Sequence, residues 1–185
     1  MYVACMESRV EEPFVERALT ELVREKIFEA IERTEHLVSM VPADRLNWVP
    51  ASPSAAAPPR ALGQRIGHLL DCLAGFCAVF AKAFPNQLAD FQQLRSFQVN
   101  QFCSPEEASK GIRMFAGYIE RGFACCGDSD LRRKVPTVFV AEGEAVLTLL
   151  LGNLEHLNNH KYQLFLHLKL AGVAVSTPDI YRLRQ

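Results

Sequence analysis

A single stretch near the C-terminus, residues 147–172, most constrains how this 185-residue chain can fold. Its leucines return every three or four positions, which is the period of an α-helix, and together they make one continuous apolar stripe. They are Leu147, Leu150, Leu154, Leu157, Leu164 and Leu168. We therefore predict one long helix over 142–171 that ends at Gly172 and needs other helices to cover its apolar stripe.

Two histidines stand beside this stripe. His156 and His160 are four residues apart, so a helix places them one above the other, at the edge of the buried face. Asn153, Gln163 and His167 continue the same polar line. His167 lies ~10 Å beyond His160 along the helix, too far to bind the same ion. Alone, the pair is a weak indication of a divalent metal site, and two ordinary surface or boundary histidines would give the same pattern.

Three further segments repeat apolar residues at helical spacing. They span about 13–41, 60–84 and 105–126. The third opens with Ser104-Pro105-Glu106-Glu107, in which a capping hydroxyl precedes a proline and two acids near the positive end of the helix dipole. Four long amphipathic helices with no clear sheet predict an all-α four-helix bundle.

The connections between these helices are long. Proline-rich residues 42–59 form a loop between the first two helices, in which Trp48 packs against a bundle end or lines a pocket. Residues 85–104 are a crossover that carries the chain along the bundle, with a short helix around 87–95. Residues 128–141 are expected to be an extended loop, because their segment KVPTVFV has the composition of a strand but no evident partner strand.

Composition and charge narrow the class of protein. Apolar residues make up 49% of the chain, enough for one domain at 13–185 after a flexible tail at 1–12. Twenty basic and 21 acidic residues give a net charge of −1 with no basic run, which argues against nucleic-acid binding. Apolar runs stop short of the ~20 residues of a membrane span, and the N-terminus carries acids where a signal peptide has bases. We expect a cytoplasmic protein with reduced cysteines.

A metal site needs more than the HxxxH pair, because catalytic sites usually combine three protein ligands with an open position. His68 is the other histidine in a helix that could pack alongside, although the periodicity of 60–84 makes it a boundary residue. Cys72, four residues after His68, is a rival ligand whose thiolate would favour zinc and a structural site. His36 has charged neighbours and is expected to be solvated.

Two segments resemble a known family. VPADRLNWVPASPSAAAPPRALGQRIGHLL, followed much later by NLEHLNNHKYQLFLHLKLAGV, is similar to the pattern of the DinB/YfiT-like superfamily of metal-dependent proteins. The resemblance covers most of 37–84 and 142–173, whereas 85–135 match nothing in that pattern. It implies a four-helix bundle in up-down-down-up order, with a divalent metal held by His68, His156 and His160.

The site implied by this resemblance has a definite chemistry. Three neutral imidazoles leave the charge of a divalent ion uncancelled, so a bound water or thiol is shifted toward its anion near neutral pH. Nickel, zinc, iron and manganese all accept such ligands. The family often has a second histidine directly after the last ligand, where this chain has Lys161. Side chains that could orient the ligand imidazoles, or be ordinary polar residues on a helix flank, are Asp71, Asn153 and Gln163.

Three functions from different classes follow. The resemblance implies a metal-dependent enzyme, either a transferase that acts on a low-molecular-weight thiol, as some superfamily members do, or a hydrolase-like enzyme. The second reading is a module that binds a metal or small ligand without turning it over. The third is a structural bundle with incidental histidines, whose apolar faces would serve a homodimer.

Overall fold

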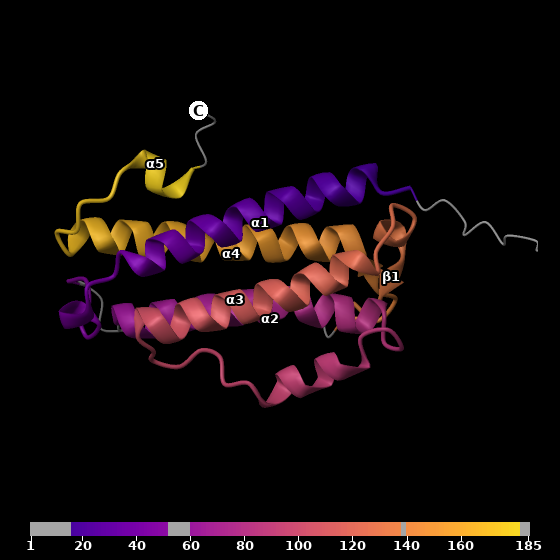
Figure 1. Ribbon diagram of the computed structural model, residues 1–185, viewed down its shortest axis with the longest axis horizontal. Helices are drawn as coiled ribbons and strands as arrows, with labels where there is room; N and C mark the ends of the chain where they lie inside the picture. The colour runs from indigo at the N-terminus through magenta and orange to yellow at the C-terminus, as the bar shows by residue number, and fades with distance from the viewer. Residues whose placement is uncertain (1–15, 52–59, 138–139, 182–185) are drawn as a thin grey trace, which may run out of the picture.

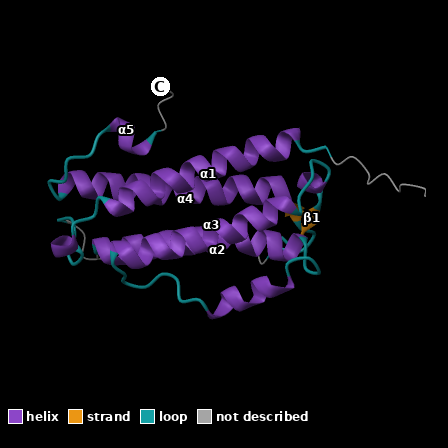
Figure 2. Cartoon of the chain, in the orientation of Figure 1, coloured by secondary structure: helices purple, strands orange, loops and turns teal. Residues whose placement is uncertain are grey.

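The computed structural model describes residues 16–51, 60–137 and 140–181, so the tail expected at 1–12 lies outside the described residues. Helices dominate the described chain, as Figure 2 shows. The all-α fold predicted from the sequence is confirmed, and each long helix forms close to its predicted range. The four long helices are α1 (Ala18–Ser39), α2 (Leu62–Ala83), α3 (Pro105–Ala124) and α4 (Val146–Leu170).

Hydrogen bonds near the helix ends fix the directions of these helices. The Cys103 N–H donates to the Gly63 carbonyl, so α3 begins at the same end of the bundle as α2. The Val146 N–H donates to the Arg133 carbonyl, so α4 begins where α3 ends. As the chain colours in Figure 1 show, α1 and α4 run one way and α2 and α3 the other.

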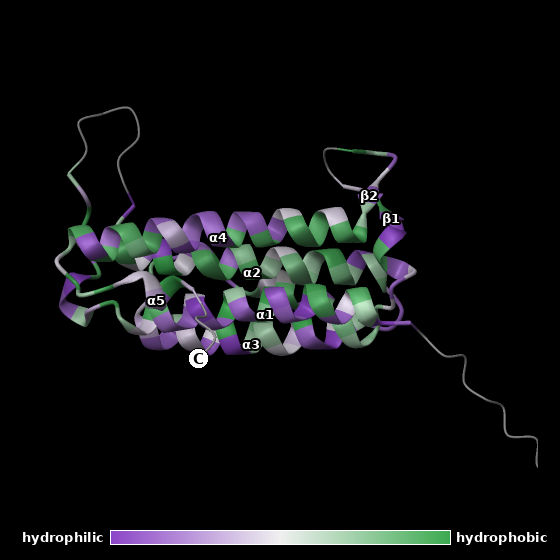
Figure 3. Ribbon diagram, turned by 90° about the horizontal axis from the view of Figure 1, so that it is seen from above, coloured by the Kyte–Doolittle hydropathy of each residue, from purple (hydrophilic) through white to green (hydrophobic). Residues whose placement is uncertain are grey.

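The core lies between these four helices. α2 packs against α3 and α4, and α1 packs against the same two helices. Apolar and polar positions alternate along the helices in Figure 3, as amphipathic helices require. By length and composition alone, α2 is apolar enough to cross a membrane. However, 67% of its most apolar 18-residue stretch is buried inside the bundle, as in the core helix of a helical domain. Aromatic side chains dominate the centre of the core, namely Phe76, Phe80, Phe115 and Phe123.

The crossover between α2 and α3 lies directly on α2. It contains a 3-10 helix, η2 (Ala89–Ser96), near the short helix predicted at 87–95. After η2 the chain runs back along α2, and the Asn100 N–H donates to the Gly67 carbonyl. A Cβ at Gly67 would lie 1.6 Å from the Gln101 carbonyl oxygen, so only glycine permits this approach. The crossover therefore covers the first half of α2.

One sequence expectation about the shorter elements is wrong. The KVPTVFV segment does find a partner, because β1 (Lys134–Val135) pairs antiparallel with β2 (Glu144–Ala145) immediately before α4. A pairing of two residues leaves no periodicity for the sequence to reveal. The His36 side chain is 40% exposed, as its charged neighbours predicted, and its Nε2 lies 2.8 Å from the Asp179 carboxylate of α5 (Thr177–Ile180). Two shorter 3-10 helices are η1 (Ala43–Arg45) and η3 (Asp130–Arg132).

Candidate metal centre

Three histidines from two helices meet between α2 and α4. His68 Nε2 lies 3.0 Å from His160 Nε2, and His160 Nε2 lies 3.0 Å from His156 Nε2. The three rings are edge-to-face, with centroids 4.2 to 5.7 Å apart. The Nε2 atoms of all three side chains therefore converge on one small volume.

The three rings differ in burial. His68 is only 8% exposed, so the boundary position that periodicity gave it is corrected. The reason is the crossover, which covers the flank of α2 that a helix on its own would leave open. His160 is half-buried and His156 is exposed, so the group is open to solvent on its α4 side. His160 thus lies at the edge of the buried face as predicted, whereas His156 is more exposed than that prediction implied.

Outer hydrogen bonds hold two of these rings and determine their tautomers. His68 Nδ1 lies 2.6 Å from Asn100 Oδ1, and the amide nitrogen of Asn100 donates to the Asp71 carboxylate. The carboxylate fixes which way the Asn100 amide points, so its oxygen faces His68. His68 Nδ1 must then carry the proton and donate it. The Nε2 lone pair of His68 is left facing the other histidines.

His160 is held in the same way from the opposite side. Its Nδ1 lies 2.9 Å from Gln163 Oε1, and the same oxygen accepts a hydrogen bond from Arg65 Nη1 at 2.5 Å. Because arginine can only donate, the atom facing it is the amide oxygen, and His160 Nδ1 must be a donor. Two Nε2 lone pairs thus point at each other across 3.0 Å.

This donor set fits a divalent metal ion. Lone pairs that converge repel one another unless a cation lies between them, and zinc binds histidine nitrogens at ~2.0–2.1 Å, which separates tetrahedral ligands by ~3.3 Å. The observed separations of 3.0 Å are close to that value. Burial lowers the pKa of His68 and lowers that of His160 to about 4, which keeps both rings neutral and able to ligate at neutral pH.

Cys72 completes a group of four with these histidines. One ligand atom from each of His68, Cys72, His156 and His160 lies within 4.8 Å of the others. The Cys72 side chain is 1% exposed, and burial, reinforced by the charge of Asp71, raises the pKa of its thiol to about 12. The thiol is therefore neutral and a weak ligand unless a metal displaces its proton.

The residues predicted to orient the ligands do not all contact the rings. Asp71 reaches His68 through Asn100, with its own oxygen 3.7 Å from His68 Nδ1. Gln163 contacts His160 directly. Asn153 is not among the hydrogen-bond partners of the three rings within the described chain, and it lies where α4 approaches Gly75 of α2. A helical wheel cannot separate these cases, because Asn153 and Gln163 share one face of α4.

Two residues beside the histidines escaped the sequence reasoning. Asn100 belongs to the crossover, which carried no legible pattern, and its backbone has a left-handed φ of 66° that asparagine tolerates. Arg65 could have been found from the sequence, because an arginine within the apolar stripe of α2, three residues before His68, indicates a buried charge. Lys161 is buried on another side of α4, where its Nζ donates to the Ile180 carbonyl at 3.5 Å.

His167 lies apart from the converging nitrogens. Its ring makes an edge contact with Trp48, at 6.1 Å between centroids. Trp48 is half-buried and packs against the core, which agrees with its predicted position at a bundle end.

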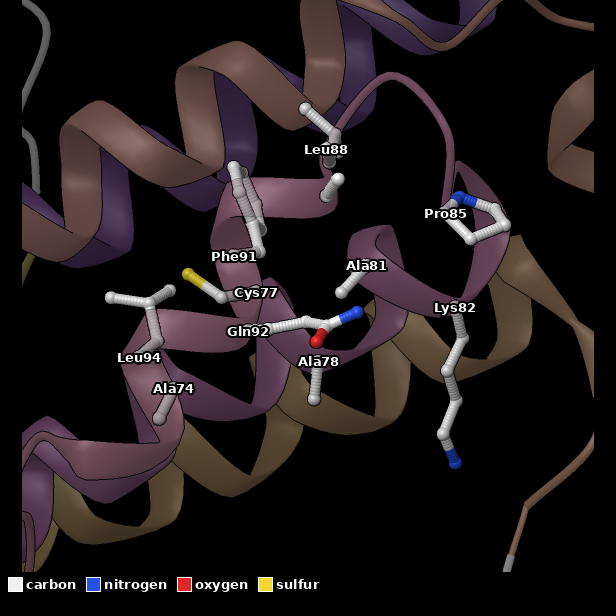
Figure 4. A pocket seen from close by; sticks show the side chains of 11 residues that line it. Ala74, Cys77, Ala78, Ala81, Lys82, Pro85, Leu88, Phe91, Gln92 and Leu94 are labelled. Atoms are coloured by element: carbon white, nitrogen blue, oxygen red, sulfur yellow. The ribbon is translucent and has the colours of Figure 1, made fainter.

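A separate cavity of about 440 Å³ lies between α2 and η2. Figure 4 shows alanines of α2 facing Phe91 and Leu94 of the crossover, with Lys82 near one end. None of the three histidines lines this cavity.

Known structures share this fold. A DinB-like protein from Bacillus subtilis superposes with a TM-score of 0.60 at 16% identity, covering 87% of this chain and 99% of that one. A DinB-like protein from Bacillus cereus gives a TM-score of 0.63 at 16% identity, covering 84% and 95%. A mycothiol-dependent maleylpyruvate isomerase gives 0.52 at 10% identity, covering 87% of this chain and 64% of the isomerase.

No family model matches the sequence, and a search of curated proteins gives no significant match. The structural likeness spans nearly the whole of the Bacillus proteins, 99% and 95% of their chains. At these identities the likeness establishes the fold, and it is the fold that the resemblance to the DinB/YfiT-like superfamily implies. The chain therefore has the helical fold of the DinB-like proteins.

Proposed function

We propose that this protein is a divalent-metal-dependent enzyme that transfers a low-molecular-weight thiol to an electrophilic substrate, with His68, His156 and His160 as the metal ligands. The observation that carries the proposal is the convergence of three Nε2 atoms, in which His160 Nε2 lies 3.0 Å from that of His68 and 3.0 Å from that of His156. The Nδ1 protons of His68 and His160 are directed outward. The thiol is suggested by the mycothiol-dependent isomerase that shares the fold.

The side chains divide the work between them. The metal, when bound, would supply a Lewis acid that lowers the pKa of a coordinated thiol. Asn100 and Gln163 keep Nδ1 of His68 and His160 protonated, so that Nε2 of each ring stays available as a ligand. His156 is exposed, which leaves a path from solvent for a thiol. The proposal places the protein in a reducing cytoplasm, where small thiols are abundant and cysteines stay reduced.

A second candidate function, metal binding without turnover, is supported by the position of Cys72 beside the three histidines. If Cys72 were a fourth ligand, His₃Cys coordination would close the site and make it structural or a metal store. Cys72→Ala separates the two. The enzyme proposal expects metal content and turnover to survive this change, whereas a four-ligand site expects metal affinity to fall sharply.

Metal content and turnover test the proposal together. Protein purified without a histidine tag is expected to hold close to one metal equivalent. It is also expected to catalyse the substitution of 1-chloro-2,4-dinitrobenzene by at least one cellular thiol, in which the thiol sulfur replaces chloride and a proton is released. His156→Ala should lose ~10-fold or more in metal affinity and nearly all turnover, since one of three ligands is gone. His36→Ala, which removes a histidine on α1 bound to Asp179, is the matched control and should change neither.

The result against the proposal is equally definite. Less than one-third of a metal equivalent, together with no rise in melting temperature on adding nickel or zinc, would exclude a metal centre. Full metal occupancy with no turnover for any thiol would favour the metal-binding alternative.

A further inference from the structure

Arg65 is an arginine buried in α2 without a carboxylate partner in the described chain. Its side chain is 8% exposed, and its Nη1 donates to the neutral amide oxygen of Gln163 at 2.5 Å. Its Nε is buried and has no hydrogen-bond partner among residues 16–51, 60–137 and 140–181. A buried guanidinium with an unused N–H is costly, because the charge has left water without full compensation.

The charges around Arg65 do not compensate it. Burial lowers the pKa of the guanidinium, and the nearby positive charge of Arg60 lowers it further. Arginine nevertheless stays protonated at any physiological pH, so the region carries a net positive charge. Such an arrangement favours an anion as the missing partner.

A second unpartnered group lies along α4. His167 Nδ1 is buried and has no hydrogen-bond partner in the described chain. Burial, and after it the charge of Arg65, lowers the pKa of His167 to about 4, so the ring is neutral and one of its nitrogens can donate. Trp48 packs edge-to-face against the His167 ring and so covers one side of that ring.

Gln163 connects this cluster to the histidines. Its Oε1 accepts from Arg65 Nη1 and also lies 2.9 Å from His160 Nδ1. His167 is four residues after Gln163 and therefore on the same face of α4. The cluster of Arg65, His167 and Trp48 thus begins one side chain away from the converging Nε2 atoms.

We propose that the Arg65–His167–Trp48 cluster binds a carboxylate group of a small-molecule substrate and so positions that substrate beside the histidines. The planar fork of an arginine matches a carboxylate with two parallel hydrogen bonds, and the free Nε belongs to such an edge. This inference rests on the proposed function for the identity of the reaction, but carboxylate binding can be measured without metal or turnover.

Trp48 is the single tryptophan of the chain and reports on the cluster directly. Its fluorescence is followed while metal-free protein is titrated with propionate, and separately with propionamide, at constant ionic strength. Propionate is expected to give a saturable change, while the neutral amide gives none. Arg65→Gln should weaken propionate binding ~10-fold or more, since a charge-assisted hydrogen bond is lost.

Two further variants guard the interpretation. Arg65→Lys keeps the charge but removes the planar fork, so it should also weaken propionate binding. This variant provides the test if Arg65→Gln does not fold. Arg60→Gln removes an exposed charge close to the cluster and should bind nearly as well as the unchanged protein. Equal responses to propionate and propionamide, or unchanged propionate binding by both folded Arg65 variants, would overturn the proposal.

The zinc-loaded protein then tells which substrate carries the carboxylate. Tighter binding of 3-mercaptopropionate than of either propionate or 2-mercaptoethanol assigns it to the thiol. Independent binding of propionate and 2-mercaptoethanol assigns it to the electrophile. Arg65-dependent carboxylate binding in protein that shows no thiol turnover would keep the carboxylate site and reject only the proposed function.

Discussion

Asn100 and Gln163 determine what the histidines can do, although neither is a candidate ligand. Each amide presents its oxygen to an imidazole Nδ1, and each is itself oriented by a charged group, Asp71 or Arg65. The charged residue thus determines the orientation of the amide, and the amide oxygen in turn keeps the proton on the imidazole Nδ1. The Nε2 lone pair is then free to bind a metal. Metal-ligating histidines generally depend on such outer partners.

Replacing Asn100 should therefore weaken metal binding without unfolding the protein. Asn100→Gly is the suitable change, because glycine accepts the left-handed φ of 66° at this position and removes only the amide. We expect zinc affinity, measured by competition with a chelator, to fall ~10–100-fold. Asn159→Ala, which removes an exposed amide on α4, should leave it unchanged. Equal zinc affinity in the two variants would contradict a role for Asn100.

At the scale of elements, the contact between the crossover and α2 assembles one side of the site. Gly67 permits the contact, and Asn100 arrives beside His68 because the crossover lies on that glycine. α4 supplies the other side through the four-residue spacing of its histidines. The site thus depends on the spacing of two histidines within α4, which is local in sequence, and on the contact between α2 and the crossover, which is not.

Gly67→Ala should show this dependence. Its Cβ would overlap the Gln101 carbonyl, so the crossover must move away and carry Asn100 with it. We expect a loss of ~1–3 kcal/mol in the free energy of unfolding, as in other overpacked sites, together with weaker zinc binding. Gly117→Ala is the matched control, since nothing lies within 4 Å of a Cβ there, and it should stabilise α3 by ~1 kcal/mol. Denaturant unfolding measures both, and a neutral Gly67→Ala would refute the argument.

At the scale of the whole molecule, the beginning of α1 is joined to the chain just after α3. Asp128 accepts hydrogen bonds from the backbone N–H groups of Leu19 and Thr20 and from the Thr20 hydroxyl, at 2.7 to 3.0 Å. These are donors that a helix start leaves without an internal partner. The cap comes from over 100 residues away in the sequence, and the helix that it caps begins at Ala18, with residues 16 and 17 outside it.

This cap makes stability depend on pH. Burial would raise the pKa of the Asp128 carboxyl, but its hydrogen bonds with Thr20 and Leu19 outweigh burial and lower it. A depressed carboxyl pKa adds stability above its unfolded value of ~3.9, and the gain disappears as the pH falls through the folded pKa. Asp128→Asn should therefore melt ~2–4 °C lower at pH 7, and the difference should disappear as the pH falls through the lowered folded pKa of Asp128. A difference independent of pH would contradict the ionic cap, and Asp44→Asn on η1 serves as control.

The sequence by itself determined the helices and half of the candidate site. Amphipathic periodicity is a local property, so the ranges of α2, α3 and α4 could be predicted to within a few residues, as could the shared face of His156 and His160. The proline and acid cap at Ser104 likewise depends on neighbours only, and the structure contains it.

Only the tertiary structure decided the rest. His68 is buried because the crossover covers it, and Asn100, Arg65 and the β1–β2 pair acquire their roles through contacts between residues far apart in the chain. Helical phase describes a helix alone and cannot say which flank another segment will cover. The convergence of three imidazoles, and the positive charge left beside them, follow from how α2, α4 and the crossover pack together.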